Sequence, residues 1–122
     1  MKSGVIKFAS ISLIVLGTVH LGFTPIICKD LSCLDFNNRL VFIFMFIATG
    51  IGIILPGIIV WLLIHKSDII TPSCGLIAYI CSIETMVTGI LAIITMFNNP
   101  FAYLMFIFGT MLFISIKQLV HK

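Results

Sequence analysis

Two titratable side chains, His20 and Glu84, lie inside long apolar stretches of the sequence. A charged carboxylate at the centre of a bilayer costs roughly 2.5–3.5 kcal/mol on insertion scales, so it turns toward a protein interior, takes up a proton, or does both. An imidazole can hydrogen-bond, exchange a proton or bind a metal. The chemistry open to this pair is therefore polar contact between helices, proton exchange or ligand binding.

Short polar and thiol side chains surround Glu84. They recur every seven residues, which places them on one stripe of a helix: Cys74, Cys81, Thr88 and Thr95. Glu84 lies four residues before Thr88 and therefore on a neighbouring face. Because this stripe is the least lipid-like face in the chain, we expect it to point into a helix bundle.

His20 shares a helix face with Gly17 and Thr24, at spacings of three and seven residues. From the rise of a helix, His20 lies about 4–5 Å to the outer side of the centre of its segment. Glu84 lies about 3 Å to the inner side of the centre of its own segment. A direct contact or a single bridging water is expected if the first and third segments are neighbours.

Three hypotheses fit these groups. The first is a structural polar clamp between helices. The second is a ligand or proton site, because ionisable groups within membranes are functional candidates; it would comprise His20, Glu84, Thr88 and Cys81. The third makes His20 a ligand of haem or another metal, but His65 and His121 fall at segment ends, so the sequence predicts no metal site.

The segments that carry these groups are long enough to cross a membrane. Leu40–Ile64 runs for 25 residues without a charged side chain, about 37 Å as a helix against about 30 Å of hydrocarbon. Hydrophobic residues make up 61% of the 122 residues and charged residues 9%, against about 25% charged in soluble domains. The sequence predicts an all-α fold, an antiparallel up-down four-helix integral membrane bundle forming one transmembrane domain over 1–122. Its spans are expected at about 8–27, 40–64, 72–97 and 100–116.

Local signals support these boundaries. Lys2 and Lys7 before an apolar run are also typical of a signal peptide, but a run of 20 residues without a small-residue cleavage site favours a first span. Thr71 and Asn99 each precede a proline, which predicts an N-cap followed by the first helical residue. The short turn at Asn99 predicts a hairpin of the last two spans.

The distribution of charge predicts the orientation. Five lysines fall on the side of the two termini and two cations on the other side, so the positive-inside rule places both termini in the cytoplasm, with the chain in the inner membrane. Cys28 and Cys33 then lie outside, where either a disulfide or two free interfacial thiols is expected.

Small residues predict where helices approach each other. Ala48 and Gly52, and likewise Thr85 and Gly89, form pairs of small residues four apart, which is typical of close packing between membrane helices. Pro56 removes one backbone donor within the second span, so a kink near Gly52 is expected.

Three motifs resemble a known group of proteins. They are Leu16-Gly17-Thr18-Val19-His20-Leu21-Gly22, a long span opening after Asn38-Arg39, and the turn Asn99-Pro100-Phe101. The pattern is similar to that of small uncharacterised four-helix bacterial membrane proteins in the style of the DoxX-like families. This resemblance implies a four-helix membrane fold and a role for His20, and it implies no activity.

The sequence therefore favours a non-catalytic protein, either an accessory subunit or a binder of a lipophilic ligand. Two alternatives use Glu84 and His20: a membrane-embedded acid/base or quinone-linked enzyme, and a proton-coupled transporter of small molecules. No cofactor is predicted, with haem and quinone kept as alternatives. The expected partners are membrane lipids, other membrane subunits or further copies of the chain. The net charge of +3 is too small and dispersed for nucleic-acid binding.

Overall fold

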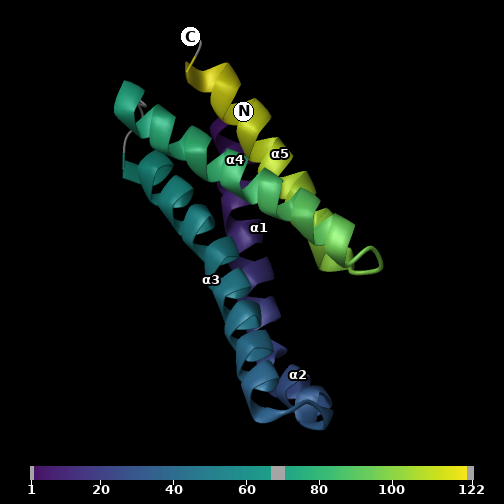
Figure 1. Ribbon diagram of the computed structural model, residues 1–122. Coiled ribbons are helices and arrows are strands. Elements are labelled where there is room, and N and C mark those ends of the chain that lie inside the picture. Colours follow the sequence, from purple (N-terminus) through teal and green to yellow (C-terminus); the bar gives the residue numbers. More distant parts are fainter. Residues whose placement is uncertain (1, 67–70, 121–122) are drawn as a thin grey trace.

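The structure, a computed structural model, describes residues 2–66 and 71–120 (Figure 1). Within these ranges every regular element is helical: α1 (Lys2–Gly22), α2 (Thr24–Asp30), the 3-10 turn η1 (Leu31–Cys33), α3 (Phe36–Lys66), α4 (Pro72–Thr95) and α5 (Pro100–Val120). Four helical stretches in the described chain are long and apolar enough to cross a membrane. The predicted all-α, four-helix membrane fold is confirmed.

Three of the four predicted spans are exceeded because helical backbone continues past the apolar run, whereas α4 ends at Thr95, two residues before the predicted end of the third span. The first span begins at Lys2 rather than Phe8, and it resumes after Phe23 as α2. Pro25 lies in the first turn of α2, where its missing amide hydrogen leaves no intrahelical bond unmade. The loop between α3 and α4 was predicted from His65 onward, and its residues 67–70 lie outside the described part of the chain.

Both predicted helix starts are confirmed. The Thr71 hydroxyl accepts a hydrogen bond from the Cys74 amide at 3.3 Å, and the Asn99 side-chain oxygen accepts one from the Phe101 amide at 3.0 Å. Each bond satisfies an amide that the first turn of a helix leaves without a partner. The Asn99 turn joins α4 and α5 into the expected hairpin.

A third cap, at Asp35, starts α3. Its carboxylate accepts from the backbone amide of Asn38 at 3.2 Å and also from the Asn38 side-chain amide. Both hydrogen bonds stabilise the ionised carboxylate and hold the pKa of Asp35 below its usual value, and the bond from the backbone amide contributes more than the bond from the side chain. Nearby, Arg39 donates to the Cys28 carbonyl at 2.8 Å and ties α2 to α3. Cys28 and Cys33 are not bonded to each other in this structure, and their oxidation state in the membrane stays a prediction.

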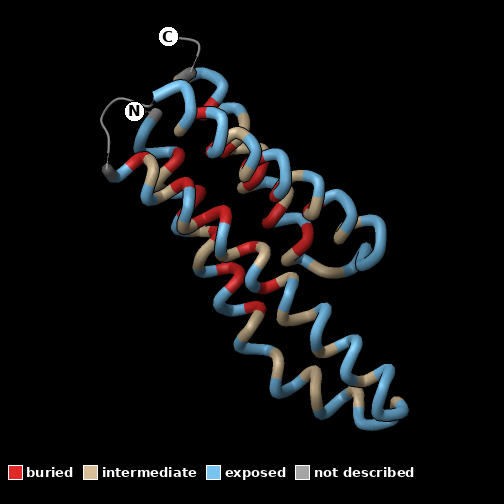
Figure 2. Tube along the Cα trace, turned by 60° about the vertical axis from the view of Figure 1, so that its left-hand side comes forward, coloured by how far each residue is buried: buried red, intermediate tan, exposed pale blue. Residues whose placement is uncertain are grey.

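The helices follow one another around the bundle in the order α3, α1, α5, α4. α1 packs against α3 and α5, whereas α4 packs against α5 and α3, so α1 and α4 lie across the bundle from each other. The described ends of α1 and α5 lie at the same end of the bundle (Figure 1). In both views the α1–α3 pair extends well beyond the turn between α4 and α5 (Figures 1 and 2).

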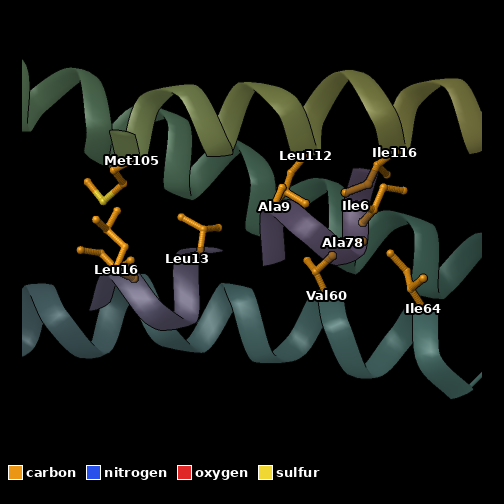
Figure 3. Packing of buried hydrophobic residues seen from close by; sticks show 11 residues of the cluster. Ile6, Ala9, Leu13, Leu16, Val60, Ile64, Ala78, Met105, Leu112 and Ile116 are labelled. Atoms are coloured by element: carbon orange, nitrogen blue, oxygen red, sulfur yellow. The ribbon is translucent and has the colours of Figure 1, made fainter. Parts of the chain in front are cut away.

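Buried residues, coloured red along the Cα trace in Figure 2, form a stripe along the centre of the bundle. Figure 3 shows residues of α1, α3 and α5 pointing toward one another, with Ala78 of α4 beside them. Ile6, Leu13, Val60 and Leu112 are fully buried. Large hydrophobic side chains such as those of Phe44 and Phe97 are exposed instead, as expected for helices that face lipid.

Glycines bring α1 and α3 together. A Cβ atom on Gly17 would lie 2.9 Å from the Gly50 carbonyl oxygen, and one on Gly57 would lie 2.8 Å from the Ser10 carbonyl oxygen. Both distances are shorter than ordinary van der Waals contact. The close approach of these two helices therefore depends on the absence of side chains at these positions.

The predicted packing pair Ala48 and Gly52 is not part of this contact. Ala48 is exposed, and a Cβ atom on Gly52 would meet nothing within 4 Å. The prediction is wrong for the packing within this chain because α3 is rotated so that Gly50 and Gly57 face α1. Pro56 is buried within α3, and helical structure is continuous across it.

The second predicted pair packs as expected. Thr85 and Gly89 are both buried in α4, and a Cβ atom on Gly89 would lie 2.8 Å from two backbone atoms of Phe106 in α5. Gly109 of α5 makes the reciprocal contact, since its Cβ atom would lie 2.9 Å from the Met86 amide nitrogen. Two glycines, one from each helix, thus set the spacing of the α4–α5 hairpin.

Candidate functional site

His20 lies between α1 and α3 with only 7% of its side chain exposed. Its Nε2 atom is 3.2 Å from the Phe46 carbonyl oxygen, and its ring stacks on the Phe46 ring with the centroids 3.9 Å apart. A carbonyl oxygen only accepts hydrogen bonds, so Nε2 carries the proton and donates it. In the neutral imidazole this leaves Nδ1 as an acceptor.

The glycine contact between α1 and α3 explains why His20 reaches a backbone carbonyl. His20 follows Gly17 by one turn, and Phe46 precedes Gly50 by one turn in the antiparallel neighbour. Because Gly17 and Gly50 let the two backbones approach, the imidazole can span the remaining distance. The sequence identified His20 and Gly17 but missed the acceptor, since a backbone carbonyl has no residue signature.

A small cavity of about 20 Å³ adjoins His20 where the four main helices meet. This volume admits one water molecule or one hydroxyl group. Three of its lining residues can form side-chain hydrogen bonds: His20, Thr49 and Asn99. The rest are apolar or thioether side chains: Ile53, Ala92, Met96, Phe101, Ala102 and Met105. Thr49 was not predicted, and Asn99 was predicted only as a helix cap.

A larger apolar groove of about 360 Å³ opens between α1 and α5. Ser12 is its one polar lining residue, and the others are Phe8, Ile11, Val15, Leu16, Val19, Phe101, Leu104 and Phe108. Phe101 lines both the groove and the small cavity. Its ring centroid lies 6.5 Å from that of His20, so the inner wall of the groove is next to the imidazole.

Glu84 lies on the outer surface of α4, and the prediction that it faces the bundle interior is wrong. The side chain is exposed, and the Thr88 hydroxyl lies 3.3 Å from its Oε1 atom and 2.8 Å from its backbone carbonyl oxygen. The buried residues of α4 are all small: Gly75, Ala78, Ser82, Thr85 and Gly89. α4 turns these residues inward because only small side chains permit its close contact with α5.

His20 and Glu84 do not form the expected pair. They lie on α1 and α4, which are on opposite sides of the bundle. The cavity beside His20 is lined by Ala92 of α4 and by Met96, which directly follows α4; both lie two to three turns beyond Glu84. Cys81, the remaining residue of the predicted ligand or proton site, is half-buried beside Glu84. The structure therefore divides the predicted site into a His20 cavity and a separate Glu84 face.

In the described part of the chain, no group of three or more His, Cys, Asp or Glu residues could hold a metal ion. Comparison with family models, curated proteins and solved structures finds no match to this chain. The class of the protein follows from its own helices, which are those of a multi-pass membrane protein.

Proposed function

We propose that this protein is a non-catalytic inner-membrane protein that binds a lipophilic ligand in the groove between α1 and α5. The observation that carries the proposal is the groove itself, about 360 Å³ in volume and lined almost entirely by apolar side chains. Sites for small ligands are typically apolar and span about 300–1,000 Å³. An acyl or isoprenoid chain is the ligand chemistry that matches this lining.

The neighbouring cavity suggests the head group of this ligand. Beyond Phe101, which both spaces share, there is room for one oxygen atom beside His20, Thr49 and Asn99. A chain that ends in a hydroxyl group could place its tail in the groove and its oxygen beside these side chains. A bulky or charged head group would not fit a volume of about 20 Å³.

The separation of His20 and Glu84 favours binding over the two alternatives. The acid/base enzyme relied on proton exchange between these groups, which lie on opposite helices of the bundle. The proton-coupled transporter relied on Glu84, which lies on the outer surface of α4. Haem ligation through Nε2 would require the loss of the hydrogen bond from His20 to Phe46. The proposed partner is therefore a membrane amphiphile with a single hydroxyl head group and an acyl or isoprenoid tail.

Native mass spectrometry of protein extracted in mild detergent tests this proposal. Wild-type protein should retain one amphiphile per chain, enriched in one lipid species. Val15→Trp fills the groove and should abolish retention. Val41→Trp is the matched control, since Val15 and Val41 are both 55% exposed and Val41 does not line the groove. Wild-type protein without a retained amphiphile, or equal retention in both variants, would overturn the proposal.

The proposed orientation, with both termini in the cytoplasm, is supported by five lysines against two cations on the other side. It can be tested with a membrane-impermeant thiol reagent on whole cells. Cys33 is exposed at the end of the bundle away from the termini, so it should be labelled from outside. A cysteine placed at Ser3 should be labelled only after the cells are opened.

A further inference from the structure

One nitrogen of the His20 ring is open to the small cavity. On the ring edge that faces α3, Nε2 donates to the Phe46 carbonyl oxygen, and Cδ2 lies 3.3 Å from where a Cβ atom on Gly50 would be. Nδ1 lies on the other edge, and no residue in the described ranges bonds to it. Because the described chain has no fully buried side-chain nitrogen or oxygen without a partner, Nδ1 keeps exposed surface. His20 lines the cavity, so the Nδ1 lone pair is available there.

The other two polar side chains of the cavity complement Nδ1. The Thr49 hydroxyl donates its proton to the Met45 carbonyl oxygen at 2.8 Å, so toward the cavity it can only accept. The Asn99 side-chain oxygen accepts from the Phe101 amide. Its Nδ2 group lies 3.9 Å from the Met96 sulfur, and since a thioether is a weak acceptor, Nδ2 remains able to donate. Two acceptors and one donor together suit a group that both donates and accepts.

We propose that His20 selects the ligand by the direction of a hydrogen bond: the site takes a free alcohol and rejects amphiphiles whose end group only accepts. The alcohol donates to Nδ1 of His20 and accepts from Nδ2 of Asn99. An aldehyde, an ether or an alkyl fluoride would set a lone pair against that of Nδ1 and leave this nitrogen unpaired, which costs more than one hydrogen bond contributes. This selection rests on the proposed function, because the tail must lie in the groove for the hydroxyl to reach His20.

The placement of the groove gives the ligand a direction. The lining on α1 runs from Phe8 to Val19, a rise of about 16 Å along the helix, and His20 follows directly. At the far end the rings of Phe8 and Phe108 meet edge to face, with their centroids 6.2 Å apart. The hydroxyl end therefore lies toward the turn between α4 and α5, where Asn99 lines the cavity. An unbranched tail runs back toward the N-terminal end of α1.

A competition between two probes of the same length tests this selection. Full-length protein in mild detergent is exchanged with equal amounts of tetradecan-1-ol and 1-fluorotetradecane, and the retained compounds are measured by gas chromatography. The fluorine resembles a hydroxyl group in size but has no proton to donate. Wild-type protein should retain about tenfold more of the alcohol, and His20→Phe should reduce this preference to about twofold or less.

His65→Phe is the matched control for this variant. His65 likewise stacks on an aromatic ring, that of Trp61, but it does not line the cavity. The variant should leave the preference for the alcohol unchanged.

Nitrogen-15 spectra of the histidine rings give a second readout on the wild-type protein. The signals of His20 are assigned by elimination with His65→Phe and His121→Phe, so this measurement does not depend on the folding of His20→Phe. Nδ1 should be unprotonated, and its signal should shift when tetradecan-1-ol is added but not when 1-fluorotetradecane is added.

The two proposals fail in different ways. If wild-type protein retains neither probe, the groove does not bind amphiphiles and the selection by His20 fails with it. If both probes are retained equally and Val15→Trp abolishes their retention, the groove stands and the selection is overturned. A preference that survives in folded His20→Phe, or a proton on Nδ1, would also overturn the selection.

Discussion

Replacing Gly89 by alanine would place a methyl group against the backbone of α5. The new Cβ atom would lie 2.8 Å from the Cα and amide nitrogen of Phe106, whereas carbon atoms in contact are about 3.5–4.0 Å apart. Both neighbours are main-chain atoms and cannot rotate away. α5 would have to move outward by about 0.7 Å or more, which would also loosen the second close contact at Gly109.

The expected free energy follows from two opposing terms. Overpacking of this kind destabilises by about 1–3 kcal/mol, while alanine is favoured over glycine in a helix by about 1 kcal/mol. We therefore expect Gly89→Ala to lower the free energy of unfolding by about 1 kcal/mol, within a range of about 0–2 kcal/mol. Gly52→Ala is the matched control, because its Cβ atom meets nothing within 4 Å. It should raise stability by about 0.5–1 kcal/mol.

Unfolding of both variants in mixed micelles, titrated with sodium dodecyl sulfate and followed by circular dichroism, would measure this difference. The signs should be opposite, with the two free energies about 2 kcal/mol apart. If Gly89→Ala proved as stable as Gly52→Ala, the glycine contact would not set the spacing of α4 and α5. The account of why α4 buries its small residues would then be refuted.

Three further outcomes are expected. His20→Phe retains the stacking on Phe46 but removes the Nε2 donor, so the free energy of unfolding should fall by only about 0.6 kcal/mol. Thr71→Ala removes a helix cap and should destabilise α4 by about 1 kcal/mol, with Thr71→Ser as the tolerated control. The hydrogen bonds from Asn38 lower the pKa of Asp35 in the folded state. The stabilising effect of the ionised carboxylate is therefore complete above the unfolded-state pKa of about 4, and it is lost as the pH falls through the lower pKa of the folded state. Amide hydrogen exchange at the start of α3, corrected for intrinsic rates, should therefore quicken as the pH is lowered below about 4, and Asp35→Asn should remove this pH dependence.

The four spans could be predicted because apolar runs of this length have few alternatives. Leu40–Ile64 is too long and too apolar for a small soluble domain. The caps at Thr71 and Asn99 were also predictable, since a capping residue followed by proline is a local signal that needs no tertiary information. The ends of α1, α3 and α5 were less predictable because helical structure there continues past the apolar run.

The inward face of each helix was harder to predict. In water a carboxyl group marks the outside of a protein, and for a membrane helix we expected the reverse for Glu84. In α4 the small residues decided the orientation instead, because close backbone contact with α5 requires them on the inside. Close backbone contact likewise involves Gly50 of α3 and not Gly52. Because both residues are glycines, the sequence does not show which of them faces α1; that depends on the rotation of α3 about its axis.

The unequal lengths of α3 and α5 have a consequence at the membrane boundary. α3 has 31 residues and α5 has 21, about 46 Å and about 32 Å as helices. The part of α3 beyond the turn between α4 and α5 still exposes apolar side chains, among them Leu40, Phe42 and Phe44. Lipid must therefore reach past the end of α5, and the two long helices must tilt to stay within about 30 Å of hydrocarbon.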